Sequence, residues 1–297
     1  METSSPRPPH SMTTRDIIIG VAWGLGAATC HSIVPIAVRL LSPHIPPIEL
    51  VFFRNFLGLL FFLSIVSWQG FGFIRTARLG AHIQRNLLLF VGMSFWFYGI
   101  SLLPMAKAVS LHFTIPLMAV PLAIIFLREW PPVTRVIWTL VGFSGVLVIL
   151  RPGMVPIGWP SLLVLGSALC YAGVSIFTRS LGKTDAPATT TFYFQSMLSL
   201  FAVVPAIYVW VMPGVSDIPA LALLATAGTA APYCFVRAVV HIEVTVVGPI
   251  EFLRLPISAG LAWLLFAETT DMWTWIGAAI IIAAAYFMTR QEHKAAS

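Results

Sequence analysis

Two ionisable residues, Glu251 and Arg254, stand three positions apart within the long apolar stretch 244–267. An ionisable group at membrane depth costs about 2.5–3.5 kcal/mol on insertion scales, so such residues are rare there and mark substrate or proton pathways. On one continuous helix, residues spaced i and i+3 share a face and can pair. The pair either binds solute, with Arg254 receiving a carboxylate or phosphate and Glu251 a proton or an ammonium group, or it fixes the register of the helix.

Two histidines are the next candidates. An imidazole can carry a proton near neutral pH, which suits proton coupling or pH gating. His112 is expected near the membrane midplane, opposite Glu251 and Arg254, and His31 lies in the first apolar stretch. The alternative for each is a neutral, hydrogen-bonded histidine between packed helices.

Three intramembrane aromatic residues are candidates for a cavity wall: Trp96, Tyr171 and Tyr233. Aromatic faces stack on planar ligands and attract cations. The same residues also serve as packing groups and interface anchors, so both interpretations stand.

Structural roles are expected for three other ionisable residues. Arg54, six residues inside the second apolar stretch, either snorkels, pairs with Glu49 or packs against the first stretch near Arg39. Glu129 and Glu268 each follow a long apolar helix, and we expect them to cap or anchor helix ends at the two membrane surfaces rather than contact substrate.

Prolines interrupt two apolar stretches at related depths: Pro116 and Pro121 in one, Pro249 and Pro256 in the other. Each proline removes a backbone donor, which is tolerated where the helix lines a cavity or meets another helix. Because both stretches are broken in this way, we expect them to form the core of the binding site.

The elements that must position these residues are transmembrane helices. The chain is 58% hydrophobic and only 9% charged, against about 25% charge in a soluble domain. An apolar run needs about 20 residues to span a bilayer. We predict an all-α polytopic membrane protein with ten spans, at 17–38, 48–68, 86–104, 106–127, 133–150, 159–181, 188–212, 218–236, 244–267 and 273–289.

The distribution of positive charge predicts the topology. Of the 17 Lys and Arg residues, three fall outside (Arg39, Lys107, Arg151) and two within spans (Arg54, Arg254), which leaves twelve on the cytoplasmic side. This positive-inside bias predicts cytoplasmic tails at 1–15 and 291–297, in a bacterial inner membrane. The polar first residues do not resemble a cleaved signal peptide.

The chain reads as two related halves, 16–151 and 158–290. Glu129 and Glu268 lie 139 residues apart, and each is followed by a helix that opens on a glycine, Gly142 or Gly277. Five spans in each half make the second half enter the membrane from the opposite side. The predicted architecture is therefore two inverted five-helix repeats around a central cavity.

Several stretches of this sequence carry a resemblance to a known family. They are Phe53-Arg-Asn55, Leu102-Leu-Pro-Met-Ala-Lys-Ala108, Phe113-Thr-Ile-Pro-Leu117, Leu127-Arg-Glu129, Val141-Gly-Phe-Ser-Gly-Val-Leu147, Arg151-Pro-Gly153, Glu251-Phe-Leu-Arg-Leu-Pro256 and Ala267-Glu268. The chain resembles the EamA-type family of the drug/metabolite transporter superfamily. The resemblance implies ten helices, a cavity lined mainly by spans one, three, four, six, eight and nine, and alternating access. Members move amino acids, nucleotides or vitamins, metallophores and drugs, inward or outward.

One departure concerns proton coupling. Small four-helix relatives couple to protons through a glutamate in their first span, whereas the first span here, 17–38, carries no acid. That mechanism therefore does not transfer to this chain.

Enzyme activity is not expected. Gly142-Phe-Ser-Gly145 has the form of an intramembrane serine protease motif around Ser144, but no histidine stands at a characteristic spacing from it, and small residues at this place suit helix packing. A passive channel is a further alternative. No cofactor or metal set is expected, and Cys30, Cys170 and Cys234 are interpreted as small apolar fillers.

The sequence therefore predicts a secondary transporter of a small organic metabolite. The leading expectation is export of an amino-acid-derived zwitterion or anion, either an amino acid or a metallophore. The alternative is uptake of a vitamin or nucleoside-like metabolite. The expected partners are the solute, the lipid bilayer and protons as a coupling ion, with no nucleic acid, and the chain acts as a monomer or homodimer.

Overall fold

The protein is seen in a computed structural model, which describes residues 14–66, 75–122, 124–125, 133–151, 158–181, 184–242, 247 and 250–296. The described residues form helices, turns and loops and contain no strand, as expected for the predicted all-α class. Glu129 and Pro249, both singled out in the sequence, lie outside the described residues.

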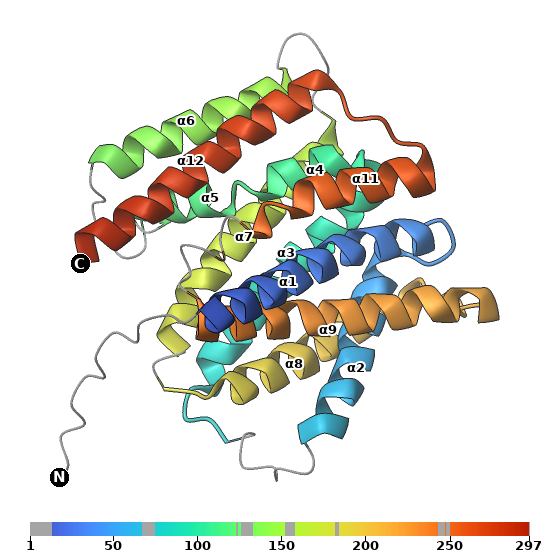
Figure 1. The fold of residues 1–297 in the computed structure, drawn as a ribbon. Coiled ribbons are helices and arrows are strands. Elements are labelled where there is room, and N and C mark those ends of the chain that lie inside the picture. The colour runs from blue at the N-terminus through green and yellow to red at the C-terminus, as the bar shows by residue number, and fades with distance from the viewer. Residues whose placement is uncertain are drawn as a thin grey trace, which may run out of the picture.

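The helices follow one another along the chain with short connections (Figure 1). The first half contains α1 (Thr14–Leu41), α2 (Pro47–Val66), α3 (Leu79–Leu102), α4 (Met105–His112), α5 (Ile115–Leu122) and α6 (Val133–Leu150). The second half contains α7 (Trp159–Leu181), α8 (Pro187–Tyr208), the short 3₁₀ helix η4 (Val215–Asp217), α9 (Ile218–His241), α11 (Arg254–Phe266) and α12 (Met272–Ala296).

Among the described residues, seven helical segments are long and apolar enough to cross a membrane. They are Ile17–Leu41, Pro47–Ser64, Leu79–Leu102, Met105–Leu122, Trp159–Thr178, Ala188–Tyr208 and Val215–His241. Three shorter apolar segments, Val136–Leu150, Arg254–Phe266 and Met272–Phe287, overlap three further predicted spans, 133–150, 244–267 and 273–289. The chain is thus a multi-pass membrane protein, and the inverted arrangement of its halves stays a prediction.

The helices pack mainly in pairs that take one member from each half. The closest pairs are α1 with α9, α3 with α7, α2 with α8, and α6 with α12. Figure 1 shows α6 and α12 side by side at the top and α1 beside α9 near the centre. A solute between the halves is therefore surrounded by helices of both.

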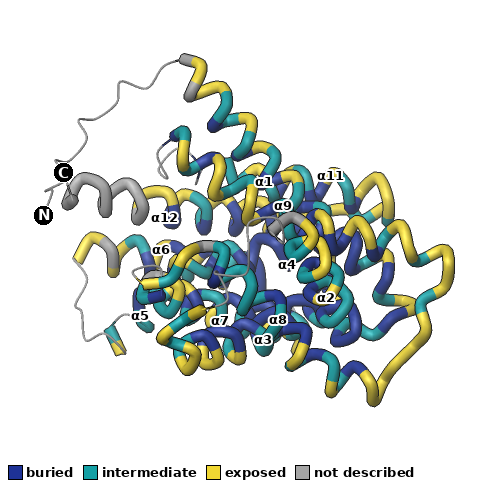
Figure 2. Tube along the Cα trace, turned by 90° about the horizontal axis from the view of Figure 1, so that it is seen from below, coloured by how far each residue is buried: buried dark blue, intermediate teal, exposed yellow. Residues whose placement is uncertain are grey.

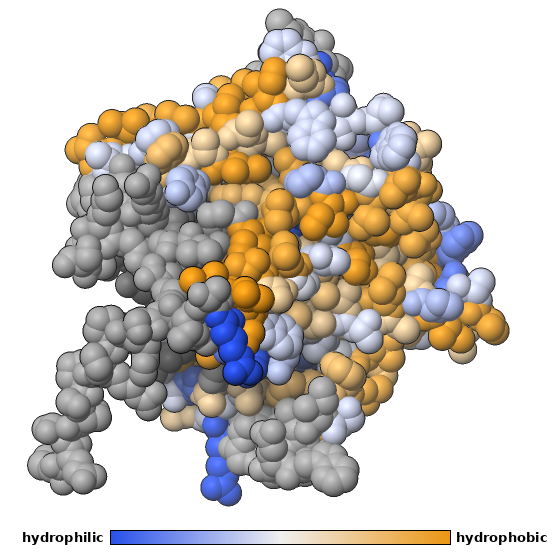
Figure 3. Space-filling model, viewed as in Figure 1, coloured by the Kyte–Doolittle hydropathy of each residue, from blue (hydrophilic) through white to orange (hydrophobic). Residues whose placement is uncertain are grey.

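The buried residues gather on the inner faces of this bundle, and the outer faces are apolar. Figure 2 shows buried segments toward the middle and exposed ones at the periphery. Outward-facing leucines such as Leu140, Leu200 and Leu264 are 65%, 65% and 69% exposed. On the coloured part of the face in Figure 3, hydrophobic residues cover much of the centre. Apolar surface of this extent suits contact with lipid.

Proline interrupts two helices at matching places. The α4–α5 segment is broken at Phe113–Thr114. The break directly follows His112, the residue four positions before Pro116. The chain is broken again at Phe252–Leu253, where Phe252 stands four positions before Pro256. A proline cannot donate to the carbonyl four residues earlier, and its ring clashes with that carbonyl, so the helix ends there.

Candidate functional site

A central cavity of about 420 Å³ lies between the two halves. Its volume falls within the range of about 300–1,000 Å³ typical of sites for small molecules. Helices of both halves contribute polar and aromatic side chains to its wall, including His31, Arg54, Arg85, Trp96, His112, Tyr171, Thr190, Phe194, Gln195, Thr229 and Arg254. Trp96, Tyr171, His31, His112 and Arg254, which the sequence singled out separately, are brought together here.

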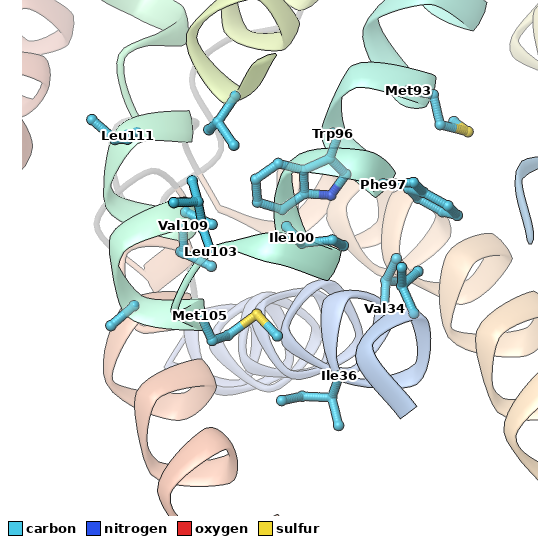
Figure 4. Close-up of a cluster of buried hydrophobic side chains, with 14 of the residues drawn as sticks. Val34, Ile36, Met93, Trp96, Phe97, Ile100, Leu103, Met105, Val109 and Leu111 are labelled. Atoms are coloured by element: carbon cyan, nitrogen blue, oxygen red, sulfur yellow. The ribbon is translucent and has the colours of Figure 1, made fainter. Parts of the chain in front are cut away.

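One wall of the cavity is an aromatic cluster of Trp96, His112 and Tyr171. The His112 ring stacks on Trp96 with centroids 4.1 Å apart, and it meets Tyr171 edge to face at 5.1 Å. Its Nε2 lies 3.3 Å from the Ser167 hydroxyl, which holds the ring in place. Trp96 projects from α3 toward α4 within the buried core (Figure 4). The cluster presents aromatic rings against which a planar ring can pack.

Arg254 lines the cavity and has a hydrogen-bond donor without a partner among the described residues. It is the first residue of α11, and its guanidinium lies over the Phe113 ring at 5.6 Å. Its Nε is buried and meets no hydrogen-bond acceptor in the described part of the chain. The Ser32 hydroxyl donates to the backbone carbonyl of Arg254 at 3.3 Å and so ties this helix start to α1. Arg254 can therefore donate to an acceptor group of a solute.

Arg54 also lines the cavity, and the predicted pairing with Glu49 is wrong. Its guanidinium donates to Asn55 Oδ1 and to the Gly228 carbonyl, both at 3.0 Å, and lies over the Phe194 ring. Glu49 instead accepts the amide N–H of Val211 at 3.0 Å. The side chain turns inward because α2 packs on α8 and α9. Gly228 of α9 accepts one of its hydrogen bonds, and Phe194 of α8 supplies the ring that the guanidinium covers.

Arg85 and Gln195 are cavity residues that the sequence analysis did not select. Arg85 donates to the Thr178 hydroxyl and to Asn86 Oδ1, each at 2.8 Å. Gln195 reaches the Thr229 hydroxyl at 3.4 Å, and its Oε1 has no partner among the described residues. Arg85 was counted with the cytoplasmic positive charges, although it falls inside an apolar helix; that position is the signal that could have revealed it.

Glu251 pairs with His31 rather than with Arg254, so the predicted pair is wrong. Its Oε2 lies 3.0 Å from His31 Nδ1, and the described residues contain no hydrogen bond or ion pair between Glu251 and Arg254. The prediction assumed one continuous helix, whereas the break at Phe252–Leu253 separates the two residues. The carboxylate is therefore free to point toward α1.

Tyr233 does not join the cavity wall. It is 59% exposed on α9 and meets Trp23 edge to face, with ring centroids 5.9 Å apart. Thr229 and Pro232 of the same helix line the cavity instead. Of the two interpretations that the sequence left open for Tyr233, the structure places it as a packing residue outside the cavity wall.

Ser144 stands apart from the cavity as well. Its hydroxyl is exposed on α6 and donates to the Val141 carbonyl at 2.7 Å, and no histidine among the described residues is bonded to it.

Near the C-terminal end of α3, an ion pair joins the two halves of the chain. Arg39 lies 2.5 Å from Glu268 Oε1 and donates to the carbonyls of Ile100 and Leu103. The second oxygen of Glu268 accepts the amide N–H of Met105 at 2.8 Å, at the first residue of α4. Glu268 thus holds a helix start in place, although the sequence suggested a role at the end of its own helix.

At the other end of α3, a buried histidine bonds a carboxylate. His82 Nε2 lies 2.6 Å from Asp185 Oδ2, which also accepts the Thr76 hydroxyl at 2.7 Å. The hydrogen bonds from His82 and Thr76 lower the pKa of Asp185 below its usual range. This end contact joins the start of α3 to the connection between α7 and α8.

The charge of the cavity is positive. Three arginines and two histidines line it, and its described lining contains no Asp or Glu. Groups of three His, Cys, Asp or Glu side chains that could hold a metal ion are not found among the described residues. The arrangement suits a planar solute that carries hydrogen-bond acceptors.

The chain is similar to known proteins both in sequence and in fold. The profile of the EamA-like transporter family matches residues 18–151 and again residues 158–290. A solved crystal structure superposes with a TM-score of 0.65 over 94% of this chain and 99% of its own, at 18% identity, and so shares the fold.

Curated relatives align with nearly the whole chain. An S-adenosylmethionine uptake transporter of Rickettsia bellii (strain RML369-C) is 30% identical over 94% of this chain and 96% of its own. A riboflavin transporter of Brucella anthropi is 30% identical over 84% and 89%. A pseudopaline exporter of Pseudomonas aeruginosa is 26% identical over 92% and 96%. These names indicate a small-metabolite transporter, and they favour the uptake alternative over the export that the sequence analysis put first.

Proposed function

The chain belongs to the EamA-like transporter family, and from this premise we propose that it takes up a vitamin-like or nucleoside-like metabolite with a planar heterocyclic ring, by alternating access. We place it in a bacterial inner membrane with both termini in the cytoplasm, as the positive-inside bias favours.

The aromatic wall of the cavity carries this proposal. Trp96, His112 and Tyr171 present stacked and edge-on rings within a volume suited to a drug-sized molecule. Stacking on such rings contributes about 0.5–1.5 kcal/mol for each ring pair beyond the burial of apolar area. A flavin or purine ring fits this chemistry better than an aliphatic amino acid does.

The arginines around the cavity favour one kind of ring. S-adenosylmethionine carries a sulfonium cation, whereas riboflavin is neutral and has ring carbonyl oxygens. Three guanidinium groups line the cavity against one carboxylate beside it, Glu251. This excess of positive charge disfavours a cation, and the guanidinium groups donate to carbonyl, carboxylate or phosphate oxygens. We therefore expect a neutral or acceptor-rich solute of the flavin type in preference to a sulfonium compound.

The packing of the two halves supports alternating access. The family profile matches each half once, and the closest helix pairs take one member from each half. The contacts Arg39–Glu268 and His82–Asp185 lie toward opposite ends of α3, beyond the cavity on either side. Opening one end while the other stays closed would expose the cavity to one side of the membrane at a time.

Uptake of radiolabelled riboflavin tests the proposal. Bacteria that lack their own riboflavin importer would express the chain and be assayed beside cells carrying an empty vector, with labelled S-adenosylmethionine as a second solute. We expect accumulation of riboflavin in the expressing cells. If neither solute accumulates, and an amino-acid-derived chelator leaves preloaded cells faster when the chain is present, the proposal is overturned in favour of export.

A further inference from the structure

A histidine and a carboxylate from opposite halves of the chain meet beside the cavity. His31 Nδ1 on α1 lies 3.0 Å from Glu251 Oε2. The imidazole lines the cavity and is 31% exposed, while the carboxylate is 15% exposed. A proton that enters the cavity therefore meets the imidazole first.

The carboxylate of Glu251 is incompletely satisfied. Its Oε1 is buried, and no hydrogen-bond donor in the described part of the chain reaches it. An unpaired buried acceptor costs about 1–3 kcal/mol, and more when it is charged. The Oε1 lone pairs are therefore open to a proton, next to a histidine that lines the cavity.

From this geometry we propose that His31 and Glu251 form the proton-binding site that couples solute uptake to the proton gradient, one proton entering with each solute molecule. The inference rests on the proposed function. With one proton on His31 Nδ1, donated to the Glu251 carboxylate, the pair carries a net charge of −1. A second proton, taken from the outer side, brings the charge to zero and is released to the cytoplasm when the cavity opens inward.

Arg254 links this proton to the solute. It begins α11 three residues after Glu251, whose charge acts on it directly, and its Nε has no partner among the described residues. While the pair is negative, it supplies a counter-charge for Arg254. Once the pair is neutral, Arg254 has lost this counter-charge, so a hydrogen bond from Arg254 to an oxygen of the solute becomes more favourable. Proton binding and solute binding therefore strengthen each other.

The other charged and titratable groups around the pair do not supply a competing acid. Arg254 of α11 and Arg54 of α2 act on His31, and His112 of α4 is near enough to His31 and Arg254 to be affected by both. Tyr171 of α7 faces Arg254, and Cys234 of α9 lies next to Cys30 on α1. Glu251 is the carboxylate that acts on His31 within the described residues.

A matched control residue exists in the same protein. Glu49 is fully buried in α2, and like Glu251 it has one bonded oxygen and one buried oxygen without a partner among the described residues. It accepts a backbone N–H from Val211 and does not line the cavity. A Glu49→Gln variant therefore reproduces the loss of a buried carboxylate without touching the proposed proton site.

The test uses the full-length chain in phospholipid vesicles that enclose a red-emitting pH dye, with labelled riboflavin as the probe and S-adenosylmethionine in a second arm. We expect solute entry to acidify the lumen. An acid-outside gradient of one pH unit should raise accumulation about tenfold, since one pH unit corresponds to about 1.4 kcal/mol per proton.

The variant Glu251→Gln separates coupling from structure. Glutamine keeps an acceptor for His31, so exchange of labelled for unlabelled solute should persist, while acidification and gradient-driven accumulation are lost. Glu49→Gln should behave as the wild type. Gradient-driven accumulation in Glu251→Gln overturns the proposal, and so does loss of exchange together with accumulation, which would make the pair structural.

A second measurement keeps the proton site testable without transport. Infrared difference spectra of the purified protein between about pH 8 and pH 5 should contain a carbonyl component of the protonated Glu251 carboxyl group, present in the wild type and in Glu49→Gln and absent from Glu251→Gln. The same spectrum in all three overturns the inference. If neither solute enters wild-type vesicles, the proposed function fails, and the infrared result alone decides the proton site.

Discussion

Phe113 and Phe252 meet edge to face, with ring centroids 5.3 Å apart, at the two places where proline interrupts a helix. Phe113 begins the break before Pro116, and Phe252 begins the break before Pro256. Each phenylalanine therefore occupies a comparable place in its own half. The contact brings the interrupted segments together next to Arg254, which lies over the Phe113 ring.

The crossing of α6 and α12 depends on two glycines, Gly145 and Gly277. A Cβ added at Gly145 would lie 2.8 Å from the Gly277 carbonyl oxygen, and one at Gly277 would lie 2.6 Å from the Gly145 oxygen. Backbone atoms cannot move aside locally, so Gly145→Ala should force the helices apart and lower the free energy of unfolding by about 1–3 kcal/mol.

Thermal unfolding in detergent measures this effect, with Gly260→Ala as the control. Among the described residues, a Cβ added at Gly260 meets no atom within 4 Å beyond its chain neighbours and the backbone of its own helix, α11. Its midpoint should stay unchanged or rise slightly, because alanine favours helix. Equal midpoints for Gly145→Ala and the wild type would show that the helices separate without cost.

The aromatic wall should contribute measurably to solute affinity. Trp96→Leu removes the ring that stacks on His112, and we expect the Kd for riboflavin to rise about tenfold, corresponding to about 1.4 kcal/mol. Quenching of riboflavin fluorescence by purified protein gives the Kd. Tyr233→Leu alters an exposed aromatic residue outside the cavity and should leave the Kd unchanged. An equal loss in both variants would place the ring-binding site elsewhere.

Arg254 should act as a donor to the solute. Arg254→Gln removes a charged donor whose hydrogen bonds are worth about 1.5–3 kcal/mol, so the Kd should rise by at least tenfold. Arg237→Gln is the matched control, since Arg237 also lies over an aromatic ring, that of Trp23, but does not line the cavity. Equilibrium binding compares the two. Unchanged affinity in Arg254→Gln would remove this residue from the site.

The hydrogen bond between His82 and Asp185 should make the free energy of unfolding depend on pH. The pKa of Asp185 is lowered from 3.8 by the His82 and Thr76 hydrogen bonds, so its stabilising effect is full above that value. The effect is lost as pH falls through the lower pKa of the folded state. Asp185→Asn should therefore unfold at a lower temperature than the wild type at neutral pH, and the difference should shrink below about pH 4. Parallel melting curves at every pH would contradict this assignment.

Much of the architecture could be predicted, because the length of an apolar run and the position of a proline each determine the local structure of the chain. The runs around α1 to α3 and α7 to α9 are long enough to span a bilayer, and Pro116 and Pro256 indicate helix breaks from their own chemistry. The predicted span 133–150 coincides with α6 (Val133–Leu150). The spans 244–267 and 273–289 differ from α11 (Arg254–Phe266) and α12 (Met272–Ala296), since an apolar sequence alone does not determine where a helix begins or ends.

The site was only partly predictable. His112, Trp96 and Tyr171 were each singled out and do gather at the cavity. Which residue pairs with Glu251 could not be inferred, because its partner His31 is 220 residues away and local spacing pointed to Arg254 instead. Arg54 was assigned a structural role for a similar reason, as its acceptors Asn55 and Gly228 become visible only once α2 and α9 are packed.

The three arginines of the cavity also bear on the ion gradients of the cell. A pathway through the membrane that is wide enough for a heterocyclic solute is wide enough for sodium or potassium. A cation about 7 Å from one guanidinium meets a repulsion on the order of 2 kcal/mol at an effective dielectric constant of about 20, and three such groups line the wall. The cavity can therefore admit a neutral organic molecule while it excludes the inorganic cations whose leakage would discharge the membrane.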